Sequence, residues 1–465
     1  MKNTLILAIA LLFLQGCLKS YDNATDEALD YLGSSDVQAL EEQFTKLSAQ
    51  YNVKSLSEHD LHVAYWTFAN ANPSFEPVLI DWSKRYPQSY HAAIANGLYQ
   101  HAIGNIKRGE QWSKDTSEEK MSGMKEHKNI AKQEFSRAIK IDDKAPFAYG
   151  YMLSVYRHIG KREDLVKTME TGLRSNPASY VIRSGYLSAL VPKWGGDIED
   201  MIAFLENTAS YTDKNSDLNM LMGFYESTGA DYLGVNKRYK EAAEWQGKAL
   251  EKGTDSWMTS YAAADYVRIK DYKTAEPLFT KAINLNPANL HAYVWQGHML
   301  RGQEKYQAAV RSFKSALRLN PENNKALLGY ARTLAKMGDH KEAKAQFEKA
   351  LAGYGAGNAY LLKEFSKFLY FDMKNFKYAN EITKQGIKVA PKNVNLWFRY
   401  GMSFNFMRDC KATGALKTYA QICSEKKGGC NKKNSSIAAS TREALISHGY
   451  CKDTEATKLS DLDVG

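Results

Sequence analysis

The hydrophobic pattern of this 465-residue chain is that of paired amphipathic helices. From about residue 128 to residue 425, apolar residues recur at positions i, i+3, i+4 and i+7, and short polar turns separate these stretches. A step of 34 residues links the members of three series: Ala275, Ala309 and Ala343; Phe279, Phe313 and Phe347; and Ala282, Ala316 and Ala350. The small Ala residues let neighbouring helices approach, and the Phe residues fill the adjoining grooves. The pattern therefore predicts an all-α fold of stacked helical hairpins.

This repeat resembles the tetratricopeptide repeat family. The family's signature positions are occupied by Gly297, Tyr306, Ala309, Phe313, Ala316 and Pro321. The resemblance implies a right-handed solenoid of helical hairpins. Further hairpins are expected over 218–253, where a longer loop resembles the Sel1-type variant, over 360–391, and from Trp397 onward.

The first third of the chain is helical in pattern but does not follow the 34-residue repeat. Periodicity and capping residues predict its helices, with Ser34-Ser35 capping the first and Ser57 the second. These helices are expected over 36–51, 58–70, 74–85, 89–107 and 117–140.

The segment Pro192-Lys193-Trp194-Gly195-Gly196 resembles the most specific motif of an uncharacterised bacterial domain, Pro-Lys/Arg-Trp-Gly-Gly, which precedes such repeats. The resemblance covers roughly residues 60–215 and implies no activity. The two Gly residues allow a tight reversal, Asp197 can cap a helix over 198–206, and Trp194 can pack on the neighbouring hairpin. We interpret the segment as a structural corner in preference to a ligand site.

The N-terminus has the pattern of a secretory signal. One Lys precedes an apolar run from Leu5 to Leu14, which is too short to span a bilayer because that needs about 20 residues. Leu14-Gln15-Gly16-Cys17 resembles a bacterial lipobox, which implies that Cys17 becomes a lipidated N-terminus. An ordinary cleaved signal with an incidental Cys is the alternative. Leu18 in place of Asp favours the outer membrane, and we expect the protein on its periplasmic side, although no residue determines the side.

The expected domain organisation follows from these segments. It comprises a signal peptide over 1–16, a tether over 17–33, a helical domain of unknown function over 34–215, tetratricopeptide-like repeats over 216–425, and a stapled cap with a tail over 426–465. The formal charge of +10 falls to +9 without residues 1–16, since one Lys is lost (61 − 52 = 9). These charges are dispersed, so neither they nor the export signal favours a nucleic-acid partner.

Four cysteines besides Cys17 lie in the last 56 residues, at positions 410, 423, 430 and 451. An even number in an exported chain indicates two disulfides, and the gaps lack the C-x2-C step of a zinc site. Cys410 and Cys423 would stand at opposite ends of one helix, about 20 Å apart, so they cannot pair. If 436–447 is an antiparallel helix, Cys410 pairs with Cys451 and Cys423 with Cys430. The alternative joins Cys410 to Cys430 and Cys423 to Cys451. Either pair of bridges would staple the last repeat.

The sequence contains no recognisable catalytic motif. H-E-x-x-H, G-x-S-x-G and G-x-x-x-x-G-K-[ST] do not occur, and the glycines over 353–357 follow a helix, which favours a loop. His59 and His62 flank Asp60, a spacing that we assign to packing in preference to a metal site. We predict no catalytic residue, no metal and no cofactor, with an enzyme in the first third as a distant alternative.

The resemblance implies a concave groove lined by positions 2, 5, 9 and 12 of each first helix. Carried onto this chain, these positions place six candidate binding residues in the groove: Trp257, His291, His298, Arg301, Lys325 and Arg332. Such a basic groove suits an acidic or C-terminal peptide, with a merely solvated face as the alternative. Ser260 and Ala264 do not match the Lys and Asn of the chaperone-type carboxylate clamp. The predicted function is a lipid-anchored interaction scaffold for an envelope protein, with binding of a cell-wall or acidic envelope glycan as the alternative.

Overall fold

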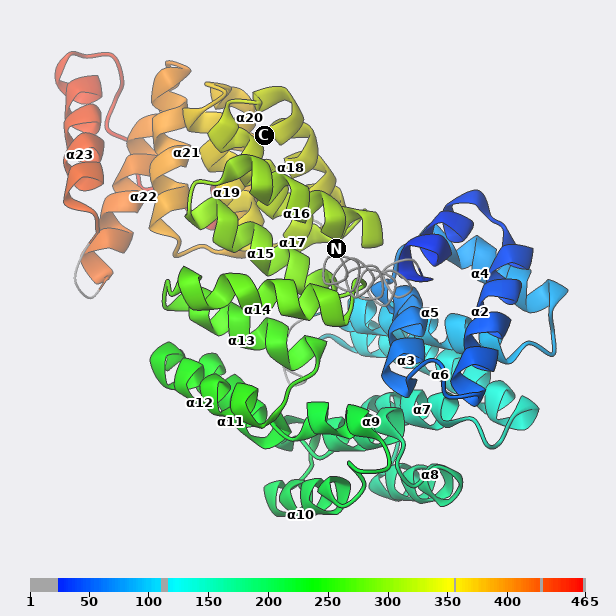
Figure 1. The fold of residues 1–465 in the computed structure, drawn as a ribbon. Coiled ribbons are helices and arrows are strands. Elements are labelled where there is room, and N and C mark those ends of the chain that lie inside the picture. The colour runs from blue at the N-terminus through cyan, green and yellow to red at the C-terminus, as the bar shows by residue number, and fades with distance from the viewer. Residues whose placement is uncertain (1–23, 110–115, 355–356, 427–429, 463–465) are drawn as a thin grey trace, which may run out of the picture. The chain divides into compact units, whose positions relative to one another are not determined.

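The computed structural model describes residues 24–109, 116–354, 357–426 and 430–462, which form helices joined by turns (Figure 1). Within these ranges no β-strand occurs, in agreement with the predicted all-α class. None of the helices in the same ranges is both long enough and apolar enough to cross a membrane. The signal segment and Cys17 lie outside the described residues.

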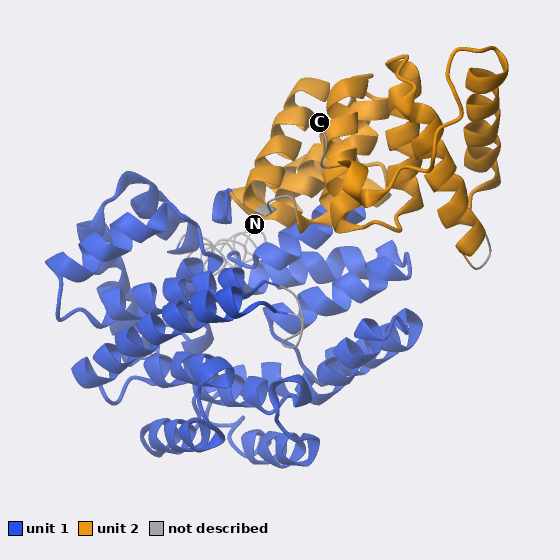
Figure 2. Ribbon diagram, turned by 180° about the vertical axis from the view of Figure 1, so that it is seen from behind, with its two compact units in different colours: residues 1–299, 318–321 blue, residues 300–317, 322–465 orange. Residues whose placement is uncertain are grey.

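Two compact units divide the chain: unit 1 contains residues 1–299 and 318–321, and unit 2 contains residues 300–317 and 322–465 (Figure 2). The helices up to residue 285 are α2 Val37–Asn52, α3 Glu58–Trp66, η1 Thr67–Asn70, α4 Phe75–Arg85, α5 Tyr90–Arg108, α6 Glu118–Ile141, α7 Pro146–Ile159, α8 Arg162–Ser175, α9 Tyr180–Ala189, η3 Pro192–Trp194, α10 Ile198–Ala209, η4 Ser216–Leu221, α11 Phe224–Val235, α12 Tyr239–Lys252, α13 Ser256–Arg268 and α14 Tyr272–Leu285. The later helices are α15 Leu290–Gly302, α16 Tyr306–Leu319, α17 Asn324–Met337, α18 His340–Tyr354, α19 Ala359–Phe371, α20 Phe376–Val389, α21 Val394–Phe406, α22 Lys411–Glu425, α23 Lys432–Ser447 and η6 Leu459–Leu462.

The helices predicted in the first third are present, with ends displaced by a few residues. Ser57 caps α3 in a capping box with Asp60, as its position suggested. The first cap is different: Asp36, and not Ser34 or Ser35, accepts the amide of Ala39 at the start of α2. Asp is as good an N-cap as Ser and stands one residue closer to the first apolar position of the helix.

Residues 24–34 are helical, and 24–33 of these belong to the stretch expected to be a tether. Ala28, Leu29 and Leu32 are buried in the core of unit 1. From residue 24 onward this stretch is therefore part of the folded unit, because its apolar residues share one helix face and have a surface to pack against.

An aromatic cluster forms the N-terminal part of the core of unit 1. The Phe44 ring of α2 lies 5.0 Å from that of Tyr65 in α3, 5.3 Å from that of Phe68 and 6.0 Å from that of Trp82 in α4, measured between centroids. All four side chains are fully buried, and the Trp82 indole donates to Glu41 (2.7 Å). Buried aromatic side chains contribute large apolar areas, so this cluster holds the first three helices together.

Two carboxylates cap helices that are distant in sequence. Glu58, in the first turn of α3, accepts hydrogen bonds from the Ser179 hydroxyl (2.5 Å) and from the backbone amide of Tyr180 (2.8 Å) at the start of α9. Asp217 in η4 accepts the backbone amide of His59 (2.9 Å) at the start of α3. Both carboxylates are buried, so each satisfies amides that water cannot reach. These two caps join α3, α9 and η4 across 121 and 158 residues of sequence.

The Pro192–Gly196 segment is the predicted corner. Gly195 has a φ of 82°, and a Cβ on Gly196 would lie 2.2 Å from the backbone of Leu190, so the reversal needs both glycines. Asp197 then caps α10 by accepting the amides of Glu199 and Asp200.

The 34-residue series marks the helix contacts as predicted. Ala275, Phe279 and Ala282 are fully buried in α14 of unit 1, where the hairpins α11–α12 and α13–α14 each pack as a pair. The predicted boundary at 215/216 falls inside this unit, because these hairpins share it with the first helices. The boundary at 215/216 between the domain of unknown function and the tetratricopeptide-like repeats therefore stays a prediction from the sequence.

Unit 2 consists of further hairpins of the same kind. Helices α17 and α18, α19 and α20, and α21 and α22 pack as successive pairs, and α20 also packs on α21. The Phe347 ring stacks on Phe365 with centroids 5.0 Å apart. A Cβ on Gly401 would lie 2.6 Å from Leu416, so this glycine lets α21 and α22 approach closely. The predicted solenoid of tetratricopeptide-like hairpins is confirmed.

Two disulfides close the C-terminal end, with the preferred pairing. Cys410 is bonded to Cys451 and Cys423 to Cys430, with Cα–Cα distances of 5.4 and 5.3 Å. The alternative pairing is therefore excluded in this structure. Helix α23 lies between Cys430 and Cys451 in the sequence, and it is longer than the predicted helix over 436–447.

The predicted tail after Cys451 is packed against the rest of unit 2 over residues 452–462. The Thr457 amide donates to the carbonyl of Gly414 (3.2 Å), and the Thr418 hydroxyl donates to the carbonyl of Thr457 (2.8 Å). Leu462 is fully buried. The tail can lie along α22 because Gly414 has no side chain; a Cβ there would lie 2.7 Å from the carbonyl oxygen of Glu455.

Loss of the Cys410–Cys451 bridge is expected to destabilise unit 2 more than loss of the Cys423–Cys430 bridge. The first spans 41 residues and the second 7, so the entropy of loop closure predicts costs of about 4 and about 2 kcal/mol. The two double Cys→Ser variants of the full chain would be compared by urea unfolding, followed in the C-terminal region. Equal midpoints, or a larger loss without the short bridge, would contradict this expectation.

Glu58 is expected to make stability depend on pH. Burial raises the pKa of Glu58 from 4.5 to about 7, outweighing the donors that contact it. Because the folded state holds this proton more tightly, the contribution is full below pH 4.5 and is lost as the pH rises to about 7.

The wild type should therefore lose up to about 3 kcal/mol relative to Glu58→Gln between pH 4.5 and pH 7. Urea unfolding at several pH values measures this difference. Glu163→Gln, at an exposed position of α8, is the matched control and should follow the wild type. Parallel pH profiles for wild type and Glu58→Gln would contradict the assignment.

Candidate functional site

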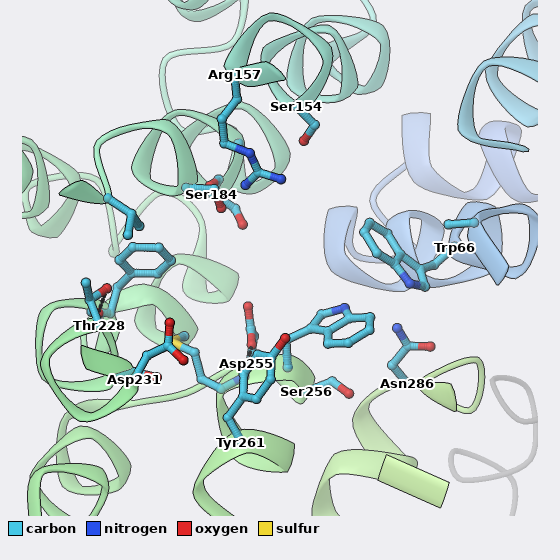
Figure 3. Close-up of a pocket in the computed structure, with 18 of the residues that line it drawn as sticks. Trp66, Ser154, Arg157, Ser184, Thr228, Asp231, Asp255, Ser256, Tyr261 and Asn286 are labelled. Atoms are coloured by element: carbon cyan, nitrogen blue, oxygen red, sulfur yellow. Dashed lines mark hydrogen bonds between the residues drawn. The ribbon is translucent and has the colours of Figure 1, made fainter. Parts of the chain in front are cut away.

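A cavity of about 630 Å³ lies within unit 1. Its walls come from helices α3, α5, α7 and α9 on one side and from α11 and α13 on the other (Figure 3). It thus lies between the helices of the first third and the first hairpins, and its volume suits one small ligand or the end of a chain.

Aromatic rings form one part of the wall. Trp66 of α3 and Trp257 of α13 meet edge to face with centroids 5.8 Å apart, and Tyr261 follows Trp257 at 6.2 Å. Tyr261 is 44% exposed, so this wall opens outward. The indole nitrogen of Trp257 is covered and has no hydrogen-bond partner among the described residues. Flat apolar surfaces of this kind suit a ring or a large apolar side chain.

Charged groups line the opposite part. Arg157 of α7 points into the cavity in Figure 3, and its guanidinium lies 5.0 Å from the ring centre of Trp194. Lys193 forms an ion pair with Asp231 of α11 at 2.7 Å. Burial lowers the pKa of Arg157 to about 10, so the side chain stays charged at neutral pH.

The floor of the cavity is polar and closely hydrogen-bonded. Nδ1 of His62 lies 3.0 Å from the Tyr151 hydroxyl, and burial lowers the pKa of His62 to about 3. Asp255 caps α13 by accepting a hydrogen bond from the amide of Met258 (2.8 Å). Its second carboxylate oxygen accepts a hydrogen bond from the hydroxyl of Tyr180 (3.4 Å). Burial raises the pKa of Asp255. These groups are engaged in holding the helices that form the cavity.

A buried Lys lies behind the cavity wall. Lys128 of α6 is fully buried, and its amine donates to the carbonyl of His101 (2.9 Å) and to Oδ1 of Asn105 (2.6 Å). Burial and, secondarily, the Arg157 charge lower the pKa of Lys128 to about 6. His101 and Asn105 line the cavity, so Lys128 fixes two residues of its wall.

The pair His59 and His62 is a packing feature. The two rings lie 6.5 Å apart, and each contacts the ring of Tyr180. Among the described residues no group of three His, Cys, Asp or Glu side chains is placed to hold a metal ion.

The six predicted groove residues divide between the units, and each set is described by itself. In unit 1, Trp257 lines the cavity, His291 lies 4.6 Å from the Tyr261 ring, and His298 lies 5.9 Å from Trp295. Their assignment to one groove stays a prediction.

In unit 2, Arg301, Lys325 and Arg332 lie on α15 and α17. Arg332 is ion-paired with Glu364 (3.2 Å) and donates to the Tyr360 hydroxyl (2.5 Å). Arg301 is half-buried, and its Nε has no hydrogen-bond partner among the described residues. The basic character is therefore partly neutralised by a carboxylate that the pattern of first helices did not indicate.

Sequence reasoning missed the cavity itself. Trp66, Arg157 and Asp231 are 74 or more residues apart in the sequence, and no local spacing connects them. The only available signal was an Arg near the end of α7, a helix whose other positions are mostly apolar or aromatic.

Comparison with protein families gives two partial matches. Residues 300–361 match the Tetratricopeptide repeat model, and residues 30–173 match a Domain of unknown function, DUF4034. The second match ends before Pro192, so it does not include the corner motif that carried part of the resemblance. The search of curated proteins gave no match.

Several solved structures are similar to this chain. A human IFIT1 dimer with PPP-AAAA is 16% identical, covers 79% of this chain and 94% of its own, and has a TM-score of 0.44. PilF of Pseudomonas aeruginosa is 16% identical, with coverages of 47% and 97% and a TM-score of 0.40. A thermophilic TPR protein of Thermus thermophilus is 18% identical, with coverages of 39% and 99% and a TM-score of 0.35. The chain thus carries a DUF4034 match followed by a tetratricopeptide repeat match, in an all-helical hairpin fold.

Proposed function

We propose that this protein is a lipid-anchored scaffold of a bacterial envelope that binds a protein or peptide through its helical hairpins and catalyses no reaction. The observation that carries the proposal is the array of stacked hairpins in unit 2, part of which matches the tetratricopeptide repeat model. Stacked hairpins expose a long surface built from successive helices, and such surfaces serve extended partners better than small substrates.

Export is supported by the cysteines and by the N-terminal pattern. Two disulfides in one chain are typical of an oxidising compartment such as the periplasm. The segment Leu14–Cys17 supplies a lipidation site at Cys17, and Leu18 favours the outer membrane. We infer an outer-membrane lipoprotein that faces the periplasm.

The proposed peptide site in unit 2 is the basic surface of Arg301, Lys325 and Arg332. The Arg332 guanidinium already contacts Glu364, and burial together with the neighbouring Arg332 charge lowers the pKa of Arg301. An acidic or C-terminal group of a partner would add negative charge beside these neighbouring cations. Charge-assisted hydrogen bonds to Arg are the stronger kind, so this surface favours acidic partners.

Charge reversal on this surface is expected to abolish capture of the partner. The full chain and the variant Arg301→Glu, Lys325→Glu, Arg332→Glu would be crosslinked in membranes, purified and read by mass spectrometry. Because three cations become anions, an acidic partner should be lost by about 10-fold or more.

The matched control carries Arg311→Glu, Lys349→Glu and Lys388→Glu, on the second helices α16, α18 and α20, and should keep the partner. If the variant Arg301→Glu, Lys325→Glu, Arg332→Glu still captured the partner, this surface would be excluded as the binding site. Enrichment of no protein by the wild type would exclude the scaffold and favour a glycan ligand, measured by binding to purified cell wall.

A further inference from the structure

Arg157 is a cation in the wall of the unit 1 cavity for which the described part of the chain supplies no counterion. The other Arg and Lys side chains of the described wall are paired, Lys193 with Asp231 and Arg268 with Asp265. Within the described residues Arg157 forms no ion pair, and its Nε is covered without a hydrogen-bond partner. A guanidinium removed from water without an acceptor is costly, so this arrangement favours a bound anion.

An aromatic ring and buried groups with lowered pKa values surround Arg157. Trp194 stacks on the guanidinium and lies 4.8 Å from the His158 ring, which fixes the Arg side chain from one side. Lys128 and Arg157 both lower the pKa values of His101 and His158, after the larger effect of burial. Burial and the Arg157 charge thus keep Lys128 and the two His mainly neutral at pH 7, so Arg157 is the charged member of this group.

The charge balance of the described wall points to a single negative charge on the ligand. Two cations are neutralised by Asp231 and Asp265, and the Asp255 carboxylate is engaged by the N-terminus of α13 and by Tyr180. One guanidinium remains. Its forked donors match the planar geometry of a carboxylate.

The ligand also needs a flat or large apolar body. Trp66, Trp257 and Tyr261 present rings to the same cavity. Figure 3 shows Trp66 and Arg157 entering the cavity from different helices, with Tyr261 rising from the opposite wall. A ligand in this space can therefore place an acid group and a ring on different walls at once.

We propose that the unit 1 cavity binds a monocarboxylate with an aromatic or large apolar body, whose acid group is held by Arg157 and whose body lies against Trp66, Trp257 and Tyr261. Two sources share this chemistry: a free organic acid, and the C-terminus of a peptide that ends in an aromatic residue. The site uses none of Arg301, Lys325 and Arg332, so it can be present whether or not the basic surface of unit 2 binds a partner.

Binding of model acids to the full chain tests this site. The probes are N-acetyl-phenylalanine and N-acetyl-Ala-Ala-Ala-Phe, each as the free acid and as the C-terminal amide, followed by tryptophan fluorescence and calorimetry. The acids should bind about 10-fold or more tightly than the amides, because the amide loses a charge-assisted pair with Arg. Equal binding of acid and amide, or no binding of either acid up to about 10 mM, would overturn the proposal.

Variants locate the acid group. Arg157→Gln should weaken the acids by about 10-fold or more and leave the amides unchanged. Arg174→Gln is the matched control, since it removes an exposed cation of α8 that does not line the cavity, and should change binding by less than about 3-fold. Full acid binding by a folded Arg157→Gln chain would contradict the assignment, and the acid–amide comparison on the wild type holds even if this variant does not fold.

The peptide and the single amino acid distinguish the two sources. If the acids bind through Arg157 and the tetrapeptide is the tighter by about 10-fold, the site takes a peptide C-terminus. If N-acetyl-phenylalanine binds as well as the tetrapeptide, the site takes a small organic acid. Both results support the carboxylate site and assign its ligand.

Discussion

The rest of unit 1 depends on two buried helix caps, that of Glu58 on α9 and that of Asp217 on α3. Each carboxylate satisfies backbone amides at the start of a helix that lies far away in sequence, and each is buried. A helix start without such a partner would leave donors unpaired in a dry environment. The same contacts fix α3 beside α9, and these two helices supply Trp66, His62 and Tyr180 to the cavity wall.

The cavity is a consequence of that arrangement and of a second one. Helix α7 is held between α6 and α9, which brings Arg157 to the wall, while α13 brings Trp257 and Tyr261 from a hairpin. Glycines at close contacts make this packing feasible: a Cβ on Gly150 would lie 2.4 Å from Val181, and one on Gly97 would lie 2.4 Å from Phe135. A site of this kind arises between packed helices, where a few polar groups remain in an aromatic wall.

Local signals in the sequence were sufficient for the elements and the hairpins. The 34-residue series of Ala and Phe predicted residues that prove fully buried, and Ser57, Asp197 and the Cys spacing predicted local geometry that depends on only a few neighbours. Whole-unit packing was beyond such signals. In the sequence Glu58 has the position of an acidic residue in the first turn of its own helix, yet its carboxylate caps α9. No local spacing can predict this cap, because the two partners lie more than 100 residues apart.

The candidate site shows the same division. The family positions predicted Trp257 on a binding surface, and it does line a cavity, where Trp66 of α3 contacts it in addition to His291 of the next hairpin. Glu364 beside Arg332 likewise depends on packing between α17 and α19 within unit 2. Charges predicted from one helix face can therefore be offset by a side chain from another helix.

The central claim is that the first helices and the first hairpins form one cooperative body across the predicted boundary at 215/216. Native-state hydrogen exchange of the full chain at increasing urea measures this directly, by the opening free energy of each helix. The account predicts that the slowest amides of α3, α9 and α13 share one opening free energy and one urea dependence. Exchange of α13 through a separate, lower-energy opening that leaves α3 and α9 protected would contradict it.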